Sequence, residues 1–335
     1  MRPFLLLLFL GLTALPVAAR ADDFPVTLEH IYGSTTFTAK PRRVVSLSFI
    51  GHDFLLSLDV VPHALRKWYG PYPYGVWPWG QAALGEAQPI VMQGEIDIEA
   101  IAAMEPDLIV GQWSGMTAQE YALLSQIAPT LPPAPGAGDY GMGWQEMLLR
   151  LGQATGTAQK AEEIISGFDR RMAALRAAHP EWQGATAVMV WAGTSGAYTA
   201  RDIRGKFLID LGFDMPQVVQ REGLLNQSYV TVPDEDLLQL DADALIWLDA
   251  GASIDRLNRL PLRPFLRANR QGREIYSDMM LSAALSHSSP LSLDYALTTL
   301  VPLLEQALDG DPTTEVSSSR GAGILPPPAG GSDDS

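Results

Sequence analysis

The stretch IDIEAIAAMEPDLIVG, residues 96–111, decides the fold of this chain because it predicts a short helix followed at once by a buried strand. Apolar residues recur at helical spacing up to Met104, Pro106 ends the helix, and the run LIV follows. The stretch VPDEDLLQLDADALIWL, residues 232–248, repeats this layout with Glu235 in the place of Glu99. We therefore expect a molecule built from two related halves, each with strands and helices in alternation.

The sequence on either side of these stretches supports that expectation. Strand patterns over residues 43–48 and 60–65 flank a helical pattern, and a new strand pattern starts at residues 185–191. Such alternation is typical of βαβ units. The predicted fold class is α/β, with two Rossmann-like lobes whose sheets are mostly parallel. A helical pattern over residues 157–179 would extend about 35 Å, long enough to link two lobes.

These patterns give five predicted segments. They are a signal peptide (1–21), an N-terminal α/β lobe (22–142), a helical segment with the lobe-linking helix 157–179 (143–180), a C-terminal α/β lobe (181–308) and a disordered tail (309–335). Disorder is expected in the tail because Ser, Gly, Pro and Asp dominate its composition.

The first segment has the features of a secretory signal. Arg2 supplies a positive charge, residues 4–12 form the apolar run FLLLLFLGL, and the triplet ending at Ala21 is an A-x-A cleavage site. A transmembrane anchor is the alternative, but it needs about 20 apolar residues. We expect cleavage before Asp22, location in the periplasm and no stable membrane anchor.

Composition excludes several classes of protein. The 335 residues include 23 Lys and Arg against 38 Asp and Glu, a net charge of −15, and 47% of them are hydrophobic. That apolar fraction is ample for a packed core. The chain has no cysteine, which excludes disulfides, thiolate metal sites and cysteine nucleophiles. An acidic chain without a basic run lacks the positive face that phosphate contacts need, so nucleic acid is not an expected partner.

The order of four motifs resembles a known family. PRRVVSLSFIGHDFLLSLDVVP (41–62), then the stretch 96–111, the long helix and the stretch 232–248 resemble the helical-backbone periplasmic binding proteins of ABC importers. Those proteins carry ferric siderophores, haem, vitamin B12 or zinc. WYGPYPYGVWPWGQAALG (68–85) looks most like the ferric-siderophore binders. The resemblance extends from about residue 27 to residue 308.

The resemblance implies a function and its partners. It implies a monomeric binding protein, not an enzyme, that captures a ferric siderophore between two lobes and delivers it to an inner-membrane ABC permease dimer. No cofactor is implied beyond the Fe(III)–siderophore ligand itself.

Other ligands and a distant enzymatic alternative remain open at this level. Haem or cobalamin would also use an aromatic cleft. A zinc site would have to assemble His52, His63 and His287 from separate loops. Ser286, His287 and Asp294 suggest a secreted hydrolase, but no G-x-S-x-G motif accompanies them.

Aromatic and basic residues are the candidate ligand contacts. Six Trp and Tyr residues crowd into residues 68–79 between prolines, which favours a loop, and aromatic loops suit a large, partly apolar ligand. Arginines supply donors for siderophore oxygens. For each residue, core packing or a solvated charge is the alternative. The predicted ligand-binding residues are Arg66, Trp68, Tyr69, Trp113, Trp191, Arg201, Arg204 and Tyr229, and neither a catalytic residue nor a metal ligand is predicted.

Glu99 and Glu235 are the candidate permease-docking residues. Alone, each acid would stabilise a helix start through the helix dipole. The repeat places one Glu on an equivalent surface of each lobe, where two carboxylates suit two arginine pockets of a dimeric permease. The resemblance implies this docking role.

Overall fold

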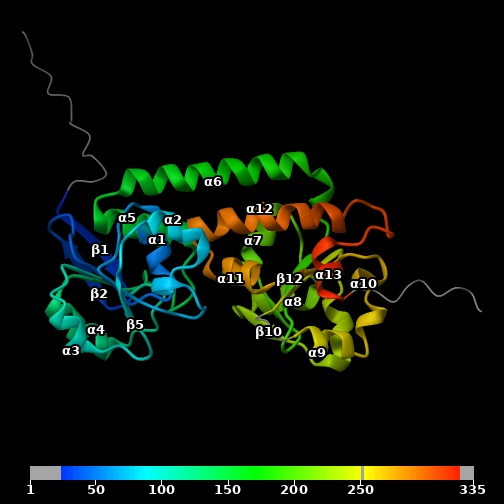
Figure 1. The fold of residues 1–335 in the computed structure, drawn as a ribbon, viewed down its shortest axis with the longest axis horizontal. Helices are drawn as coiled ribbons and strands as arrows, with labels where there is room; N and C mark the ends of the chain where they lie inside the picture. The colour runs from blue at the N-terminus through cyan, green and yellow to red at the C-terminus, as the bar shows by residue number, and fades with distance from the viewer. Residues whose placement is uncertain (1–23, 250–252, 325–335) are drawn as a thin grey trace, which may run out of the picture.

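The structure is a computed structural model that describes residues 24–249 and 253–324. Two five-stranded sheets, each covered by helices, follow one another along the long axis of the molecule (Figure 1). The predicted signal peptide and its cleavage site lie outside the described residues. Within the described ranges, no helix is both long and apolar enough to cross a bilayer.

The first sheet is entirely parallel. Its strand order is β5-β4-β3-β6-β7, and an antiparallel pair, β1 and β2, lies beside it in the same part of the chain. Every residue of β3, β4 and β6 is buried, which is the pattern of a sheet covered on both faces. The strands are β1 (Val26–His30), β2 (Gly33–Phe37), β3 (Val44–Ser46), β4 (Ala64–Arg66), β5 (Ile90–Met92), β6 (Leu108–Val110) and β7 (Thr130–Leu131).

The second sheet is mixed, with the order β10-β9-β8-β11-β12. Its central strand β8 runs parallel to β11, which runs parallel to β12, while β9 and β10 are antiparallel. The strands are β8 (Ala187–Trp191), β9 (Gly196–Tyr198), β10 (Tyr229–Thr231), β11 (Ala244–Leu248) and β12 (Glu274–Ser277). One parallel and one mixed sheet in succession, each covered by helices, confirm the predicted α/β class.

The aspartates of the sequence repeat perform the same structural task in both halves. Asp107 accepts hydrogen bonds from the backbone N–H groups of Arg42 and Arg43, just before β3, at 2.7 Å each. Asp243 accepts one from the N–H of Thr186, just before β8, at 2.9 Å. Each carboxylate lies just before one strand (β6 or β11) and fixes the start of the neighbouring central strand (β3 or β8). The repeat reflects this shared anchoring.

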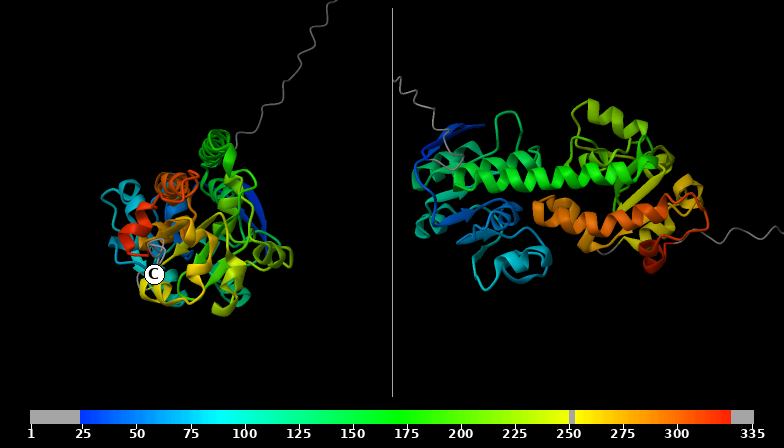
Figure 2. Two further views of the ribbon diagram at one scale, coloured as in Figure 1. Left: turned by 90° about the vertical axis from the view of Figure 1, so that its right-hand side faces the viewer. Right: turned by 90° about the horizontal axis from the view of Figure 1, so that it is seen from above.

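Two helices connect the halves. The longer, α6 (Ala158–Ala178), packs against α5 (Trp144–Thr155) of the first half and α7 (Ile203–Leu211) of the second (Figure 2). Its 21 residues extend about 31 Å. The other, α12 (Pro290–Ala307), packs against α1 (Gly51–Ser57) and α2 (Pro78–Leu84) as well as against β12.

One hydrophobic core continues across the junction. Phe54 and Leu55 of α1 belong to the same buried cluster as Leu293 and Leu297 of α12. Because α6, α12 and this shared core all contact both halves, the halves cannot separate widely.

The remaining helices are short. They are α3 (Ile98–Ala103), α4 (Ala118–Ile127), α8 (Gln217–Leu224), α9 (Ile254–Arg259), α10 (Arg267–Arg270), α11 (Met279–His287) and α13 (Ser317–Ala322), with short 3₁₀ turns η1 (Pro73–Gly75), η2 (Pro180–Trp182), η3 (Asp234–Leu240) and η4 (Arg263–Phe265).

The structure differs from the sequence-based expectation at the C-terminal tail. Residues 309–324 are folded, and α13 packs against β12. Val316 and Ile324 are buried, and the Ser319 hydroxyl donates to the Glu274 carbonyl at 2.7 Å. The expected disorder is therefore wrong for this part of the tail, because buried apolar side chains and hydrogen bonds to β12 dock it. Residues 325–335 lie outside the described residues.

Candidate ligand-binding site

A cleft of two adjoining cavities, of about 710 and 520 Å³, lies between the two sheets. Both cavities are lined by Trp68 from the first half and by Tyr198, Arg204 and Tyr229 from the second. The further lining includes Phe49, Tyr69, Trp113, Tyr140, Trp191, Thr194, Arg201, Asp202, Ser228, Thr231, Asp249, Met279, Ser282 and Ser286. Aromatic rings thus form most of the large surfaces of the cleft.

The first half contributes residues that follow the carboxyl ends of its parallel strands. Phe49 follows β3, Trp68 and Tyr69 follow β4, and Trp113 follows β6. Neighbouring parallel strands end at the same edge of a sheet, where ligands of open α/β sheets bind. The ring centroids of Phe49 and Trp113 lie 6.1 and 6.0 Å from that of Trp68. Trp68 is the centre of this aromatic wall, with 36% of its surface exposed.

The second half follows the same rule. Trp191 ends β8, Asp249 follows β11 and Met279 follows β12. Two tyrosines from the antiparallel strands complete the wall, since Tyr198 and Tyr229 are paired across β9 and β10 with ring centroids 5.1 Å apart.

Gly196 is needed for the position of Tyr229. A Cβ atom at Gly196 would lie only 1.7 Å from the Tyr229 hydroxyl oxygen. Any side chain there would displace the ring. The Tyr229 hydroxyl also lies 2.8 Å from the Thr194 hydroxyl, which fixes its polar end.

Arg204 is the half-buried cation at the centre of the cleft. Its Nε and Nη2 donate to the two carboxylate oxygens of Asp202 at 2.6 and 2.8 Å, and its Cζ lies 3.8 Å from the centre of the Tyr198 ring. Burial by itself lowers the pKa of Arg204, but the hydrogen bonds and charge of Asp202 outweigh burial and raise it. The guanidinium is therefore permanently charged and held rigidly.

Tyr69 and Tyr198 are neutral hydrogen-bond donors of the cleft. Burial raises the pKa of Tyr69 to about 12, and burial also raises the pKa of Tyr198. Both phenols keep their proton at neutral pH, so the cleft offers them as O–H groups.

Arg66 does not line the cleft, contrary to the sequence-based expectation. It is 8% exposed, and its Nε and Nη1 donate to the carbonyls of Gly94 and Ser114 at 2.9 and 3.0 Å. Its Cζ lies 4.3 Å from the centre of the Phe49 ring, and Arg66 lines neither cavity of the cleft. Arg66 lies at the end of β4, where its guanidinium donates hydrogen bonds to the loops that follow β5 and β6. These bonds hold the side chain away from the ligand. Arg66 supports the aromatic wall through its contact with Phe49.

The structure places the other seven predicted residues at the cleft: Trp68, Tyr69, Trp113, Trp191, Arg201, Arg204 and Tyr229. Sequence reasoning missed Phe49, Tyr140, Tyr198, Asp249 and Ser286. The signal for Phe49 and Asp249 was present, since each directly follows a predicted strand pattern. No local pattern marks Tyr140 or Ser286.

The aromatic stretch of residues 68–79 is only partly a loop. Pro78 begins helix α2, because proline is well suited to the first helical position, where no N–H bond is needed. Trp77 is fully buried and its ring stacks on that of Trp79, with centroids 5.1 Å apart. Trp77 packs inside the protein and Trp79 is half-buried, and neither lines the cleft.

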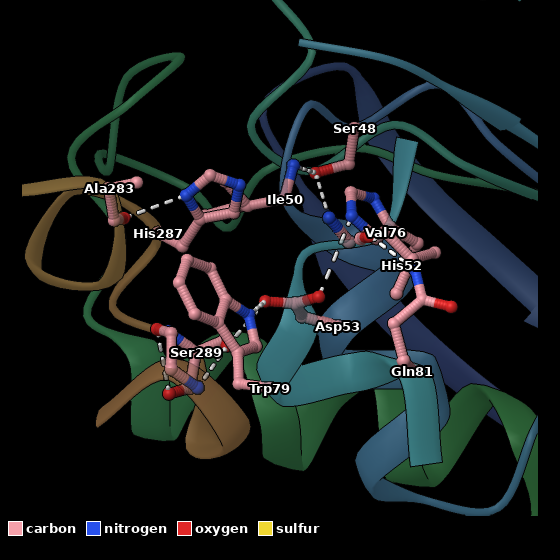
Figure 3. A network of polar contacts seen from close by, with 12 residues as sticks. Ser48, Ile50, His52, Asp53, Val76, Trp79, Gln81, Ala283, His287 and Ser289 are labelled. Atoms are coloured by element: carbon pink, nitrogen blue, oxygen red, sulfur yellow. Dashed lines mark hydrogen bonds and ion pairs between the residues drawn. The ribbon is translucent and has the colours of Figure 1, made fainter. Parts of the chain in front are cut away.

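A buried polar cluster joins the two halves (Figure 3). The Asp53 carboxylate accepts hydrogen bonds from Trp79 Nε1 at 2.7 Å and from Ser289 Oγ at 2.8 Å. Asp53 belongs to α1, while Ser289 is the N-cap residue of α12. His287 lies next to them, among the rings of Trp68, Tyr69, Trp77 and Trp79. The cleft wall is thus coupled to the junction of the halves.

Burial controls the protonation of this cluster. It lowers the pKa of His52 and of His287 to about 4 and raises the pKa of Asp53. The imidazoles are neutral at pH 7. His52 and His287 do not meet His63 in a metal site, and the described ranges contain no group of three or more His, Asp and Glu side chains placed to hold an ion.

Glu99 and Glu235 are both exposed in the first turn of a helix, in α3 and η3 respectively. The side-chain cap of α3 is Asp97, which accepts from the N–H of Ala100 at 2.9 Å. Neither Glu has a salt bridge within the described parts of the chain. Both carboxylates are therefore available to a partner.

Comparison with known proteins gives the family. The model of the periplasmic binding protein family matches residues 44–278. The probable siderophore-binding lipoprotein YfiY of Bacillus subtilis is 30% identical over 66% of this chain and 68% of its own length. The ferric enterobactin-binding periplasmic protein FepB of Escherichia coli is 30% identical over 71% of this chain and 76% of its own.

A solved structure matches the fold over nearly the whole described chain. The periplasmic solute binding protein from Mycobacterium smegmatis superposes with a TM-score of 0.76 at 33% identity, covering 85% of this chain and 99% of that one. The family model, the relatives and the solved structure all point to the same family. The chain belongs to the periplasmic binding protein family.

Proposed function

We propose that this protein captures a ferric siderophore in the cleft between its halves and delivers it, chemically unchanged, to an ABC permease of the inner membrane. The observation that carries the proposal is the aromatic cleft at the carboxyl ends of both sheets, with Arg204 fixed at its centre. Aromatic faces cover the organic shell of such a ligand. The N–H groups of Arg204 that Asp202 does not engage, together with the hydroxyls of the cleft, donate to the oxygens of the ligand. The named relatives that bind siderophores support the same ligand class.

The proposed organisation follows from the sequence and from the two connecting helices. The mature protein begins at Asp22 after removal of residues 1–21 and acts as a periplasmic monomer. Residues 22–142 form one lobe, 143–180 the connection and 181–308 the other lobe. Since α6 and α12 both pack on the two halves, ligand binding is accompanied by small lobe movements rather than wide closure.

Ligand binding is tested by quenching of tryptophan fluorescence with a panel of ferric siderophores, haem, cobalamin and Zn²⁺. Saturable quenching by at least one ferric siderophore is expected, because Trp68, Trp113 and Trp191 line the cleft. Binding of haem, cobalamin or Zn²⁺ without any ferric siderophore would contradict the proposal.

Delivery is tested separately through Glu99 and Glu235. Replacing both by alanine should leave the dissociation constant of the siderophore unchanged, because neither residue lines the cleft, and should abolish uptake through the permease. Glu86→Ala with Glu162→Ala is a control pair with the same change of net charge. Uptake at the wild-type level in the Glu99→Ala, Glu235→Ala variant would show that these carboxylates do not dock the permease.

A further inference from the structure

We infer that the cleft selects ferric siderophores whose iron complex carries no net charge, the class of the ferric tris-hydroxamates, over the trianionic ferric tris-catecholates. The inference rests on the proposed function and narrows its ligand class.

The ionised groups of the cleft sum to zero. Among the described lining residues, Arg201 and Arg204 carry positive charges, and Asp202 and Asp249 carry negative charges. The other polar side chains of the lining are hydroxyls of Ser, Thr and Tyr and the indole N–H groups of Trp. A cleft that binds three extra negative charges would need an excess of cations.

The charge of Arg204 is already balanced. Asp202 holds it in a two-point pair, so two of its five N–H groups, Nε–H and one on Nη2, face the carboxylate, and Nη1 extends toward the Ser286 hydroxyl at 3.4 Å. What Arg204 offers a ligand is therefore its remaining N–H donors, held in a fixed direction, and a flat cationic face over Tyr198. Such a donor suits the polarised oxygens around a neutral iron complex.

No other described arginine near the cleft adds a free charge to its centre. Arg66 is buried and lines neither cavity. Arg256 donates to the carbonyl of Ala192 at 2.8 Å and is paired with Asp234. Arg201 lies at the exposed end, where its guanidinium donates to Asn226.

At the opposite end, the negative charge of Asp249 lies close to the ligand space. Its carboxylate accepts from the N–H of Ser253 at 3.1 Å and from the Tyr276 hydroxyl. With a chain charge of −15, the surrounding field adds to the repulsion of anions. A trianionic ligand would therefore be repelled by Asp249 at one end of the cleft. The pair of Asp202 and Arg204 at the centre, which has no net charge, would not attract it.

The direct test compares ferrichrome, a neutral ferric tris-hydroxamate, with ferric enterobactin, a trianionic tris-catecholate. Fluorescence titrations at 20 mM and 500 mM NaCl are expected to give at least tenfold tighter binding of ferrichrome, with a constant that changes less than twofold with salt. Equal or tighter binding of ferric enterobactin would overturn the inference while leaving the proposed function intact. Binding of neither complex, nor of any other ferric siderophore, would instead contradict the proposed function.

A variant separates charge from shape. Asp202→Asn keeps the N-cap of α7, since asparagine caps as well as aspartate, and releases the charge of Arg204. The ratio of the two dissociation constants should shift at least fivefold toward ferric enterobactin. Asp210→Asn, on the same helix but away from the cleft, should leave the ratio unchanged. An unchanged ratio in a folded Asp202→Asn protein would overturn the charge argument.

Discussion

Replacing Asp53 by alanine should destabilise the protein far more than loss of an exposed carboxylate does. Asp53 is fully buried and accepts hydrogen bonds from Trp79 Nε1 and from Ser289 Oγ across the junction of the two halves (Figure 3). Each buried donor left without an acceptor costs about 1–3 kcal/mol. The expected loss is therefore about 2–6 kcal/mol of the free energy of unfolding.

Asp53→Asn should behave quite differently. The amide oxygen still accepts both hydrogen bonds, and the amide nitrogen faces His52 Nε2, which lies 3.5 Å from the second carboxylate oxygen. Asparagine also avoids the burial of a negative charge, the same effect that raises the pKa of Asp53. We expect a change of less than about 1 kcal/mol, because the hydrogen bonds and not the charge hold the cluster.

The assay is urea unfolding at pH 7, followed by far-UV circular dichroism. Asp294→Ala is the matched control, since Asp294 forms an exposed ion pair with Arg171 that should contribute at most about 1 kcal/mol. The reasoning is refuted if Asp53→Ala costs no more than the control, or if Asp53→Asn costs as much as Asp53→Ala.

Three further predictions follow from the packing. Deleting residues 309–335 should lower the thermal midpoint, because Val316 and Ile324 would leave the core, and an unchanged melting curve would mean that the tail contributes nothing. Arg66→Ala should lower the free energy of unfolding by about 3 kcal/mol, since the carbonyls of Gly94 and Ser114 each lose a charged donor, whereas Arg201→Ala should cost less than about 1 kcal/mol; equal costs would contradict the placement of Arg66. The unfolded chain binds protons on His52 and His287 at higher pH than the folded chain does, so stability should fall between pH 6.5 and 4. This is measured in Asp53→Asn, which removes the opposite contribution of the raised pKa of Asp53, and a flat pH profile there would refute it.

The sequence predicts the fold well because its pattern is local and repeated. Residues 96–111 and 232–248 each give a helical turn, an anchoring aspartate and a buried strand, and the structure has these elements in both halves. The long helix was expected over 157–179 and spans Ala158–Ala178. The docked tail was missed, because Val316 and Ile324 are two isolated apolar residues in a polar segment, and their docking depends on tertiary contact with β12.

Prediction of the site was limited in the same way, because the position of some side chains depends on tertiary contacts. Residues that follow strand patterns, such as Trp68 and Trp113, lie at the cleft because parallel strands end at one edge. Arg66 has the same sequence context, but its side chain turns to two carbonyls that come from other loops. The pairing of Arg204 with Asp202 depends on the N-cap geometry of α7. Neither the contacts of Arg66 nor the pairing of Arg204 with Asp202 can be predicted from the spacing of residues in the sequence.

The most direct measurement of the central claim is the position of iron in crystals grown with a ferric siderophore that the fluorescence panel identifies. An anomalous difference map at the iron edge should place one iron atom in the cleft between Trp68 of one half and Tyr198, Arg204 and Tyr229 of the other. An iron peak elsewhere on the protein, or an empty cleft at saturating ligand, would contradict the claim that this aromatic cleft binds the siderophore.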